Sequence, residues 1–338
     1  MKNKNLVYLV ILVVLLGVAG WLITSKNDGG TLERKMDYNF TIKDTADIDK
    51  IIIKDKSPAE VTLTREGKEW ILDNKYRARQ GAMKTLLGTL YRMELRNFIP
   101  EKMKEIVLKR MSVFGKEVQI YKNGELFKTI YVGTETQDEM GTYMMIKGSD
   151  APYAVHMPGF NGFLSTRFFT EQHLWKSRDV THMDPRNIRE ISMVYPDSSA
   201  ASFKVQMFSP DSIFVTQLST GKVLRRVNMV KTRLYIGSAA RMKYEGAILP
   251  TDPIYARRDS LLNSNPVFEI TVKDTNGKTT TLEGYHIKAA EGMMNDAGIE
   301  HKYDPDRMHG FINKDEMVLL QYAGLIEIIK PLDYFITP

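Results

Sequence analysis

The sequence predicts an α+β fold: two tandem related domains, each a mainly antiparallel sheet packed by helices, behind one N-terminal transmembrane helix. Three observations predict it. The chain begins with one long uncharged apolar run, the rest consists largely of short alternating runs typical of half-buried strands, and the order of these runs occurs twice. The composition, 43% hydrophobic and 26% charged, is that of a globular protein, and 338 residues are enough for two domains.

The apolar run extends from Leu6 to Thr24 and contains no charged residue. At about 1.5 Å per residue it has the length needed to cross a hydrocarbon core of roughly 30 Å. Lys2 and Lys4 precede it, and the positive-inside rule keeps such a start in the cytoplasm. We therefore expect a single-pass protein of the inner membrane with its C-terminal domains in the periplasm. A cleaved signal peptide is the alternative, because it shares the basic start and the apolar core.

The absence of cysteine and the spread of charge exclude several classes of site. With no cysteine in the chain, disulfides, a lipidated cysteine, thiolate metal sites and thiol nucleophiles are all excluded. The net charge of +6 is small and distributed along the chain rather than clustered. The sequence therefore predicts no binding of nucleic acid.

The chain divides into residues 1–30, the anchor and linker, residues 31–180, the first repeat, and residues 181–338, the second. In the first repeat, residues 48–72 read as three strands. A helix follows, with an apolar stripe at Met83, Leu86, Leu87 and Leu90 extending to Glu94. Residues 101–113 read as a second helix, Asn123-Gly124 as the turn of a hairpin over 118–133, and 142–147 and 153–157 as two more strands.

The second half repeats this order with a spacing that only grows along the chain. The matched positions pair Ile48 with Ile188, Lys84-Thr85 with Lys231-Thr232, Arg92-Met93 with Arg241-Met242, Glu117–Ile120 with Glu269–Val272, Ile146 with Ile312, and 167–169 with 333–335. A growing spacing is expected if the second copy carries loop insertions and keeps the element order. We interpret the chain as a tandem duplication of an α+β unit.

The strands "IDKIIIK" and "VTLTREGKEWIL", the segments "MSVFGKEVQIY" and "FKTIYVG", and above all the stretch over 153–196 resemble the domain of unknown function 4340 family. The resemblance covers nearly the whole part after the linker. It implies an envelope protein of the Bacteroidota type with an N-terminal membrane segment, often associated with transport machinery of the ATP-binding-cassette (ABC) type that includes gliding-associated subunits. It supplies no catalytic or binding residues.

No motif predicts a catalytic residue, a metal site or a cofactor. The histidines have no H-x-x-x-H spacing; they are His156, His173, His182, His286, His301 and His309. "NGKTT" over 276–280 lacks the first glycine of a phosphate-binding loop and reads as a hairpin turn. Asp304 and Asp306 could contribute to a calcium site, but Asp-Pro is common in turns. We expect no enzymatic activity; a hydrolase assembled from both repeats is the least favoured alternative.

The segment over 158–169 is the candidate partner-binding surface, because glycines and a proline frame several large aromatic rings. Its residues are Pro158, Gly159, Phe160, Asn161, Gly162, Phe163, Phe168 and Phe169. The alternative is that these rings fill the seam between the two repeats. Three tripeptides, beginning at Asp44, Asp211 and Asp259, also resemble acceptor sites for O-glycosylation.

Together these features predict a non-enzymatic docking subunit, anchored by residues 6–24 beside an ABC-type permease, its auxiliary subunits or a gliding-associated complex. The alternative is a periplasmic module that binds a glycan or a peptide in the cleft between the repeats.

Overall fold

The structure is a computed structural model that describes residues 37–57, 59–209 and 211–336. It divides into two compact units, one ending at Ser177 and the other beginning at Arg178. The sequence placed this boundary between residues 180 and 181. The predicted transmembrane segment and linker lie outside the described residues. Within those residues, no helix is both long and apolar enough to cross a membrane.

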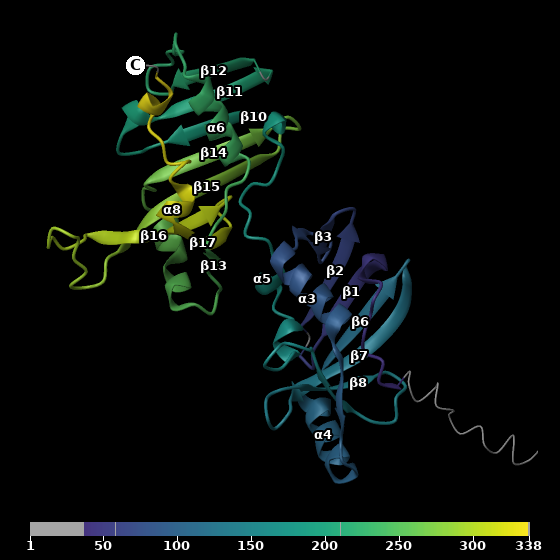
Figure 1. Cartoon of the computed structure of the whole chain (residues 1–338). Coiled ribbons are helices and arrows are strands. Elements are labelled where there is room, and N and C mark those ends of the chain that lie inside the picture. The colour runs from purple at the N-terminus through teal and green to yellow at the C-terminus, as the bar shows by residue number, and fades with distance from the viewer. Residues whose placement is uncertain (1–36, 58, 210, 337–338) are drawn as a thin grey trace, which may run out of the picture. The chain divides into compact units, whose positions relative to one another are not determined.

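The first unit contains a nine-stranded antiparallel sheet in the order β4-β3-β2-β1-β6-β7-β8-β9-β5 (Figure 1). Its strands are β1 (Ile48–Lys54), β2 (Glu60–Glu66), β3 (Glu69–Leu72), β4 (Tyr76–Arg77), β5 (Glu94–Phe98), β6 (Lys116–Lys122), β7 (Glu125–Glu135), β8 (Thr142–Ile146) and β9 (Tyr153–His156). Its helices are α3 (Gln80–Arg92), α4 (Glu101–Phe114) and α5 (Gln172–Trp175), with 3-10 turns η1 (Thr45–Asp47) and η2 (Ser165–Arg167).

The second unit contains an eight-stranded antiparallel sheet in the order β12-β11-β10-β14-β15-β16-β17-β13 (Figure 1). Its strands are β10 (Ile188–Val194), β11 (Phe203–Ser209), β12 (Ser212–Gln217), β13 (Gly246–Ala247), β14 (Phe268–Asp274), β15 (Thr279–Lys288), β16 (Tyr303–Ile312) and β17 (Glu316–Gln321). Its helices are α6 (Met229–Ala239), α7 (Arg258–Leu262) and α8 (Tyr322–Leu325). The 3-10 turns are η3 (Pro185–Asn187), η4 (Ser199–Ala201), η5 (Pro253–Arg257) and η6 (Leu332–Phe335).

Both sheets have the same connectivity, and β4 adds a ninth strand to the first. In each, the first strand lies between its hairpin partner and the strand that follows the helices, so β1 separates β2 from β6 and β10 separates β11 from β14. Each sheet then continues through three further strands to an edge strand, β5 or β13, that comes from earlier in the chain. The prediction of two mainly antiparallel sheets is confirmed, and the helices that accompany them are few.

The two sheets share a local irregularity at the same place. In the first, the pairing of β1 with β6 shifts register between Ile48 and Lys50. In the second, the pairing of β10 with β14 shifts between Ile188 and Glu190. Bulges of this kind increase the local twist of a strand and re-aim its side chains. The predicted match of Ile48 with Ile188 therefore joins positions with the same pairing geometry.

Helix α3 packs its predicted apolar stripe against the sheet. Met83, Leu86 and Leu90 are almost completely buried. The helix ends at Arg92, however, and Glu94, which the sequence assigned to it, lies in β5 opposite His156. The residue after the helix has an extended backbone, so pairing with β9 replaces the next helical turn.

The predicted match of the two main helices at Thr85 and Thr232 is wrong, because Thr85 is exposed and Thr232 is completely buried. The burial patterns instead place Leu86 with Ile236 in the interior of each unit. A helix repeats every 3.6 residues, so a two-residue match along it does not fix the alignment.

Each sheet packs on both faces, but unequally. In the first unit the large core lies beneath α3, and Met144 of β8 belongs to it. The preceding residue, Tyr143, points to the opposite face, where a small cluster with Val107 and Met111 lies beneath α4. The second unit has the same division, with Val318 of β17 in the large core and its neighbour Met317 in a small cluster.

Glycine is required where α4 meets β7. A Cβ atom on Gly133 would lie 2.6 Å from Cγ of Met111 and 2.9 Å from the Tyr143 carbonyl oxygen. Helix α4 can therefore approach the sheet only because this strand residue has no side chain.

We expect Gly133→Ala to destabilise the first unit by about 1–3 kcal/mol through overpacking. Chemical denaturation measures the loss, and hydrogen exchange should show it first in α4. Gly88→Ala is the matched control, because the space around Gly88 in α3 is open and alanine favours a helix by about 0.5–1 kcal/mol. A Gly133→Ala protein as stable as the parent would contradict this role.

Candidate functional site

The predicted partner-binding segment, residues 158–169, follows β9 and leads into α5. Its eight predicted residues divide by exposure: Pro158, Gly159 and Asn161 are exposed, Phe160, Gly162, Phe163 and Phe169 are half-buried, and Phe168 is completely buried. The turn at its start has Pro158 followed by Gly159 at φ 75°, and the Phe160 N–H donates to the Met157 carbonyl at 3.0 Å. This is the residue pattern of a type II turn.

The rest of the segment belongs to the core of the first unit. Phe168 packs within that core. The Phe169 ring lies 4.2 Å from the Trp175 ring, and Nε1–H of Trp175 donates to the Phe169 carbonyl at 2.8 Å. The longest exposed stretch of this segment is therefore its tip, Pro158 to Asn161, and Thr166 is exposed beyond it.

Arg167 contacts the aromatic ring of that tip, Phe160. Its guanidinium lies 4.2 Å from the centre of the Phe160 ring and donates to Oγ1 of Thr89 at 3.0 Å. Burial lowers the pKa of Arg167, and the nearby Arg92 lowers it further. A cation held against an aromatic face fixes the position of the Phe160 ring, which packs against the core beside the exposed turn.

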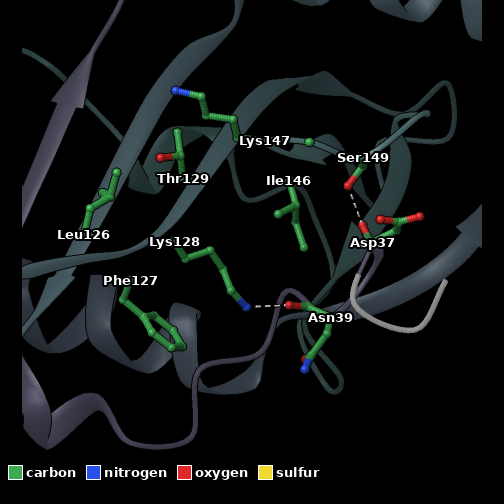
Figure 2. Close-up of a pocket in the computed structure, with 10 residues that line it drawn as sticks. Asp37, Asn39, Leu126, Phe127, Lys128, Thr129, Ile146, Lys147 and Ser149 are labelled. Carbon is green, nitrogen blue, oxygen red and sulfur yellow. Dashed lines mark hydrogen bonds between the residues drawn. The ribbon is translucent and has the colours of Figure 1, made fainter. Parts of the chain in front are cut away.

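A second candidate is a cavity of about 510 Å³ between the β6–β7 hairpin and the turn after β8 (Figure 2). It is lined by Asp37, Asn39, Leu126, Phe127, Lys128, Thr129, Ile146, Lys147, Gly148 and Ser149. Three separate stretches of chain therefore form it, and the first of them begins at the first residue that the structure describes.

Lys128 is the central polar group of this cavity. Its ammonium donates a hydrogen bond to the Asn39 carbonyl oxygen at 2.6 Å. The side chain of Lys147, in contrast, points away from Lys128 (Figure 2). Burial lowers the pKa of Lys128, and the positive charge of Lys122 lowers it further. The Phe127 ring lies between these two lysines, 4.4 Å from Nζ of Lys122 and 5.6 Å from Nζ of Lys128.

The cavity offers a ligand one ammonium group, and the carboxyl of Asp37 also lines it. A partly desolvated ammonium forms stronger charge-assisted hydrogen bonds than an exposed one. The hydroxyls of Thr129 and Ser149 add polar groups to the lining. No sequence pattern predicts this site, because its residues lie far apart in the chain and Lys128 occupies an ordinary hairpin position.

The second sheet contains a cluster of titratable residues that sequence reasoning also missed. Glu269 of β14 lies directly opposite Glu283 of β15, and Glu283 is 3% exposed. The Tyr285 hydroxyl donates to Glu283 at 3.1 Å, and Lys314 lies 3.3 Å from the same carboxylate. Burial raises the pKa of Glu269, and the neighbouring carboxyl of Glu283 raises it further. Counting outward from a two-residue turn at Asn276-Gly277 would place Glu269 opposite Gly284, one residue away from the observed pairing.

The motifs set aside in the sequence have structural roles. Residues 275–278 form the tight turn between β14 and β15, with Gly277 at φ 86°, as predicted for the "NGKTT" motif. One carboxylate oxygen of Asp304 accepts from the backbone N–H groups of Asp306 and Arg307. Among the described residues, no three acidic or histidine side chains come together as ligands for a metal ion.

Comparison with known proteins identifies one family. The model of the family described as "Domain of unknown function (DUF4340)" matches residues 70–211. These residues belong to the DUF4340 family. No curated protein and no solved structure matches the chain.

The DUF4340 segment does not coincide with one structural unit. It begins in β3 of the first sheet and ends at Asp211, just before β12 of the second. It therefore contains α3, α4 and the predicted partner segment, together with the first two strands of the second unit. The resemblance inferred from the sequence is confirmed for this segment.

We expect Glu269→Gln to raise the melting temperature of the second unit at neutral pH. Folding raises the pKa of Glu269 above its ordinary value of about 4.3. The protonated carboxyl therefore stabilises the folded state below that ordinary pKa, and this contribution to stability is lost as the pH rises through the raised pKa. The cost of a like-charge cross-strand pair is up to about 1 kcal/mol. Removing the charge should therefore raise the melting temperature by roughly 2–4 °C.

Melting curves at pH 4 and pH 7.5 provide the test, and the gain should vanish at the lower pH. Glu291→Gln, at an exposed position of the same unit, is the control. A Glu269→Gln protein that melts below the parent at pH 7.5 would show that the carboxylate stabilises the sheet.

Proposed function

We propose that this chain is a non-enzymatic envelope protein, held in the inner membrane by residues 6–24, that docks on a partner complex. The observation that supports it most is the uncharged apolar run, followed after only residues 25–36 by a folded unit. A linker of this length keeps the first unit within about 40 Å of the bilayer even when fully extended. The basic residues before the apolar run support a periplasmic location for both units.

The proposed partner is an ABC-type permease with its auxiliary subunits, or a gliding-associated complex. The resemblance to the DUF4340 family supports this choice, and the docking surface is the exposed tip at 158–161. A turn that a proline and a glycine pre-form loses little conformational entropy on binding. The Phe160 ring, held by Arg167, lies beside the tip as a rigid aromatic group.

We also propose that the two units derive from one duplicated domain. Their common strand order and the shared register shift at Ile48 and Ile188 support it. A duplicated docking domain can bind two equivalent surfaces, and linking two weak contacts strengthens the whole.

A ligand-binding role is the second candidate. The cavity around Lys128 favours it, because a half-buried ammonium, hydroxyl groups and the Asp37 carboxyl suit the polar groups of a glycan or a peptide. This cavity lies within the first unit, so such a role needs no cleft between the units.

The test of docking is purification of the full-length tagged protein from its own host, in mild detergent after brief crosslinking, with the retained proteins identified by mass spectrometry. We expect a permease and its ATPase to be retained. Asn161→Arg should reduce this retention at least fivefold, because it places a bulky charge on the tip. Asn263→Arg, at another exposed asparagine, should leave retention unchanged.

A second control separates the two candidate functions. Lys128→Met removes the ammonium from the cavity but leaves the tip intact. If this variant loses the retained proteins while Asn161→Arg keeps them, the ligand cavity and not the tip is the functional surface. If the parent is recovered alone, stable docking on a partner complex is contradicted.

A further inference from the structure

Helix α3 and the β2–β3 hairpin border a groove of about 410 Å³ in the first unit. Ten residues line it: one from η1, three from the hairpin and six from α3. The six helical residues are spaced alternately by three and by one along α3, so a single face of the helix forms one wall. This space, the α3 groove, has the volume of a small-molecule site.

Three cations line the α3 groove, and none of its ten residues is acidic. The cations are Arg65, Lys68 and Lys84. Lys68 and Lys84 are exposed, and neither forms an ion pair or a hydrogen bond with any residue that the structure describes. Glu69, which follows Lys68, is paired with Arg77 through hydrogen bonds of 2.7 and 2.8 Å. The groove therefore carries three positive charges that no carboxylate of its own lining neutralises.

Arg65 occupies a position that the alternation of β2 assigns to the core. Val61 and Leu63 of the same strand are completely buried, and Arg65 continues their face of the sheet, directly opposite Trp70 of β3. Arg65 itself is half-buried. Charges that lose hydration in this way are normally paired. Within the described part of the chain, however, no carboxylate pairs with Arg65.

The contacts of Arg65 fix its guanidinium without neutralising it. Nη2 donates to the Thr45 carbonyl oxygen at 3.0 Å, and the guanidinium lies 4.8 Å from the centre of the Trp70 ring. Nε is buried and has no hydrogen-bond partner among the described residues, and the second terminal nitrogen, Nη1, has none there either. A guanidinium that is held in one position and keeps a free terminal nitrogen is pre-organised to donate to an oxyanion.

We propose that the α3 groove binds a phosphate monoester carried by a small ligand. Such a group has nearly two negative charges at neutral pH and presents several acceptor oxygens, so it suits three cations better than a single carboxylate does. Arg65 donates to one oxygen from its fixed position. Lys68 on the hairpin and Lys84 on the helix act as flexible point charges that approach the phosphate from two sides.

The α3 groove also has an apolar wall. Leu87 is half-buried and Tyr91 is 45% exposed, so both offer surface to the carbon skeleton of a ligand. Nζ of Lys43 lies 4.5 Å from the centre of the Tyr91 ring and adds a fourth cation at this end. A soluble sugar phosphate and a lipid headgroup with a terminal phosphate share the required chemistry. The proposal goes beyond docking, because none of these residues belongs to the tip at 158–161 or to the cavity around Lys128.

The test is titration calorimetry of the full chain in a nonionic detergent, with inorganic phosphate and glucose 6-phosphate as probes and glucose as the neutral control. Both phosphates should bind and glucose should not, with an affinity that falls as the salt concentration rises. Arg65→Gln should weaken the binding of glucose 6-phosphate roughly tenfold, because it removes a hydrogen bond between charged groups. Arg65→Lys should retain only part of the affinity, since an ammonium lacks the planar fork of a guanidinium.

Lys84→Gln keeps the test decisive if the Arg65 variants fail to fold, because Lys84 is exposed. This change should weaken the binding of glucose 6-phosphate about two- to fivefold, as expected for the loss of one exposed ion pair. The matched control is Lys102→Gln, an exposed lysine on α4, which packs on the opposite face of the sheet. It should leave the affinity unchanged.

The same titration in phosphatidylcholine nanodiscs identifies the source of the phosphate. If the ligand is a lipid headgroup, phosphatidic acid in the nanodisc should compete with glucose 6-phosphate and lower its affinity severalfold. Phosphatidylglycerol, which carries a phosphate diester, should compete less at the same surface charge. If the ligand is soluble, the two lipids should have equal effects.

Two results would overturn the proposal. One is the absence of saturable binding of both phosphate probes. The other is binding that neither Arg65→Gln nor Lys84→Gln weakens, since the phosphate would then bind elsewhere on the chain. Neither result bears on docking, because retention of a partner complex is measured separately through the tip at 158–161.

Discussion

The antiparallel pairing of each unit's first strand with the strand that follows its helices holds the rest of that unit in place. β1 pairs with β6 and β10 pairs with β14, so residues far apart in sequence meet at the centre of the sheet. Ile51 and Ile120, which face each other in the first sheet, are completely buried. Their counterparts Ile191 and Val272 in the second sheet are at most 1% exposed. Bringing these distant strands together costs loop-closure entropy. The chain has no cysteine and cannot form a disulfide, so apolar burial must offset this cost.

This pairing leaves the two faces of the sheet unequal. The helix in the connection, α3 or α6, covers the large core, whereas the opposite face has only a small cluster at one end. Helix α4 therefore needs only its inner residues for packing, and Gly133 lets it approach the strand closely. Its outer side chains are free for another contact.

The strand pattern was predictable because side chains in a strand alternate between faces. Ile51, Ile53, Val61 and Leu63 all lie in the core as their alternation indicates. The edge strand β5 was missed because it is partly or fully exposed along its whole length, so its sequence does not alternate. Aromatic content alone could not separate the buried Phe168 from the exposed turn that precedes it.

The two candidate sites were predictable to different degrees. For the Glu269–Glu283 pair the sequence shows the hairpin but not its exact register, because a two-residue turn at Asn276-Gly277 would place Glu269 opposite Gly284. The cavity around Lys128 has no sequence signal, because it depends on residues from three separate stretches that only the tertiary fold brings together. Sequence patterns report which face of an element is apolar, but not which polar groups meet.

The proposed function requires that the mature protein retains the apolar run. Docking near a permease requires an anchor, which a cleaved signal peptide would remove. The most direct measurement is the intact mass of the protein isolated from alkali-washed membranes of its own host. If residues 6–24 anchor the mature protein, the chain should resist the wash and its mass should include those residues. A protein released by alkali, with a mass that lacks those residues, would contradict it.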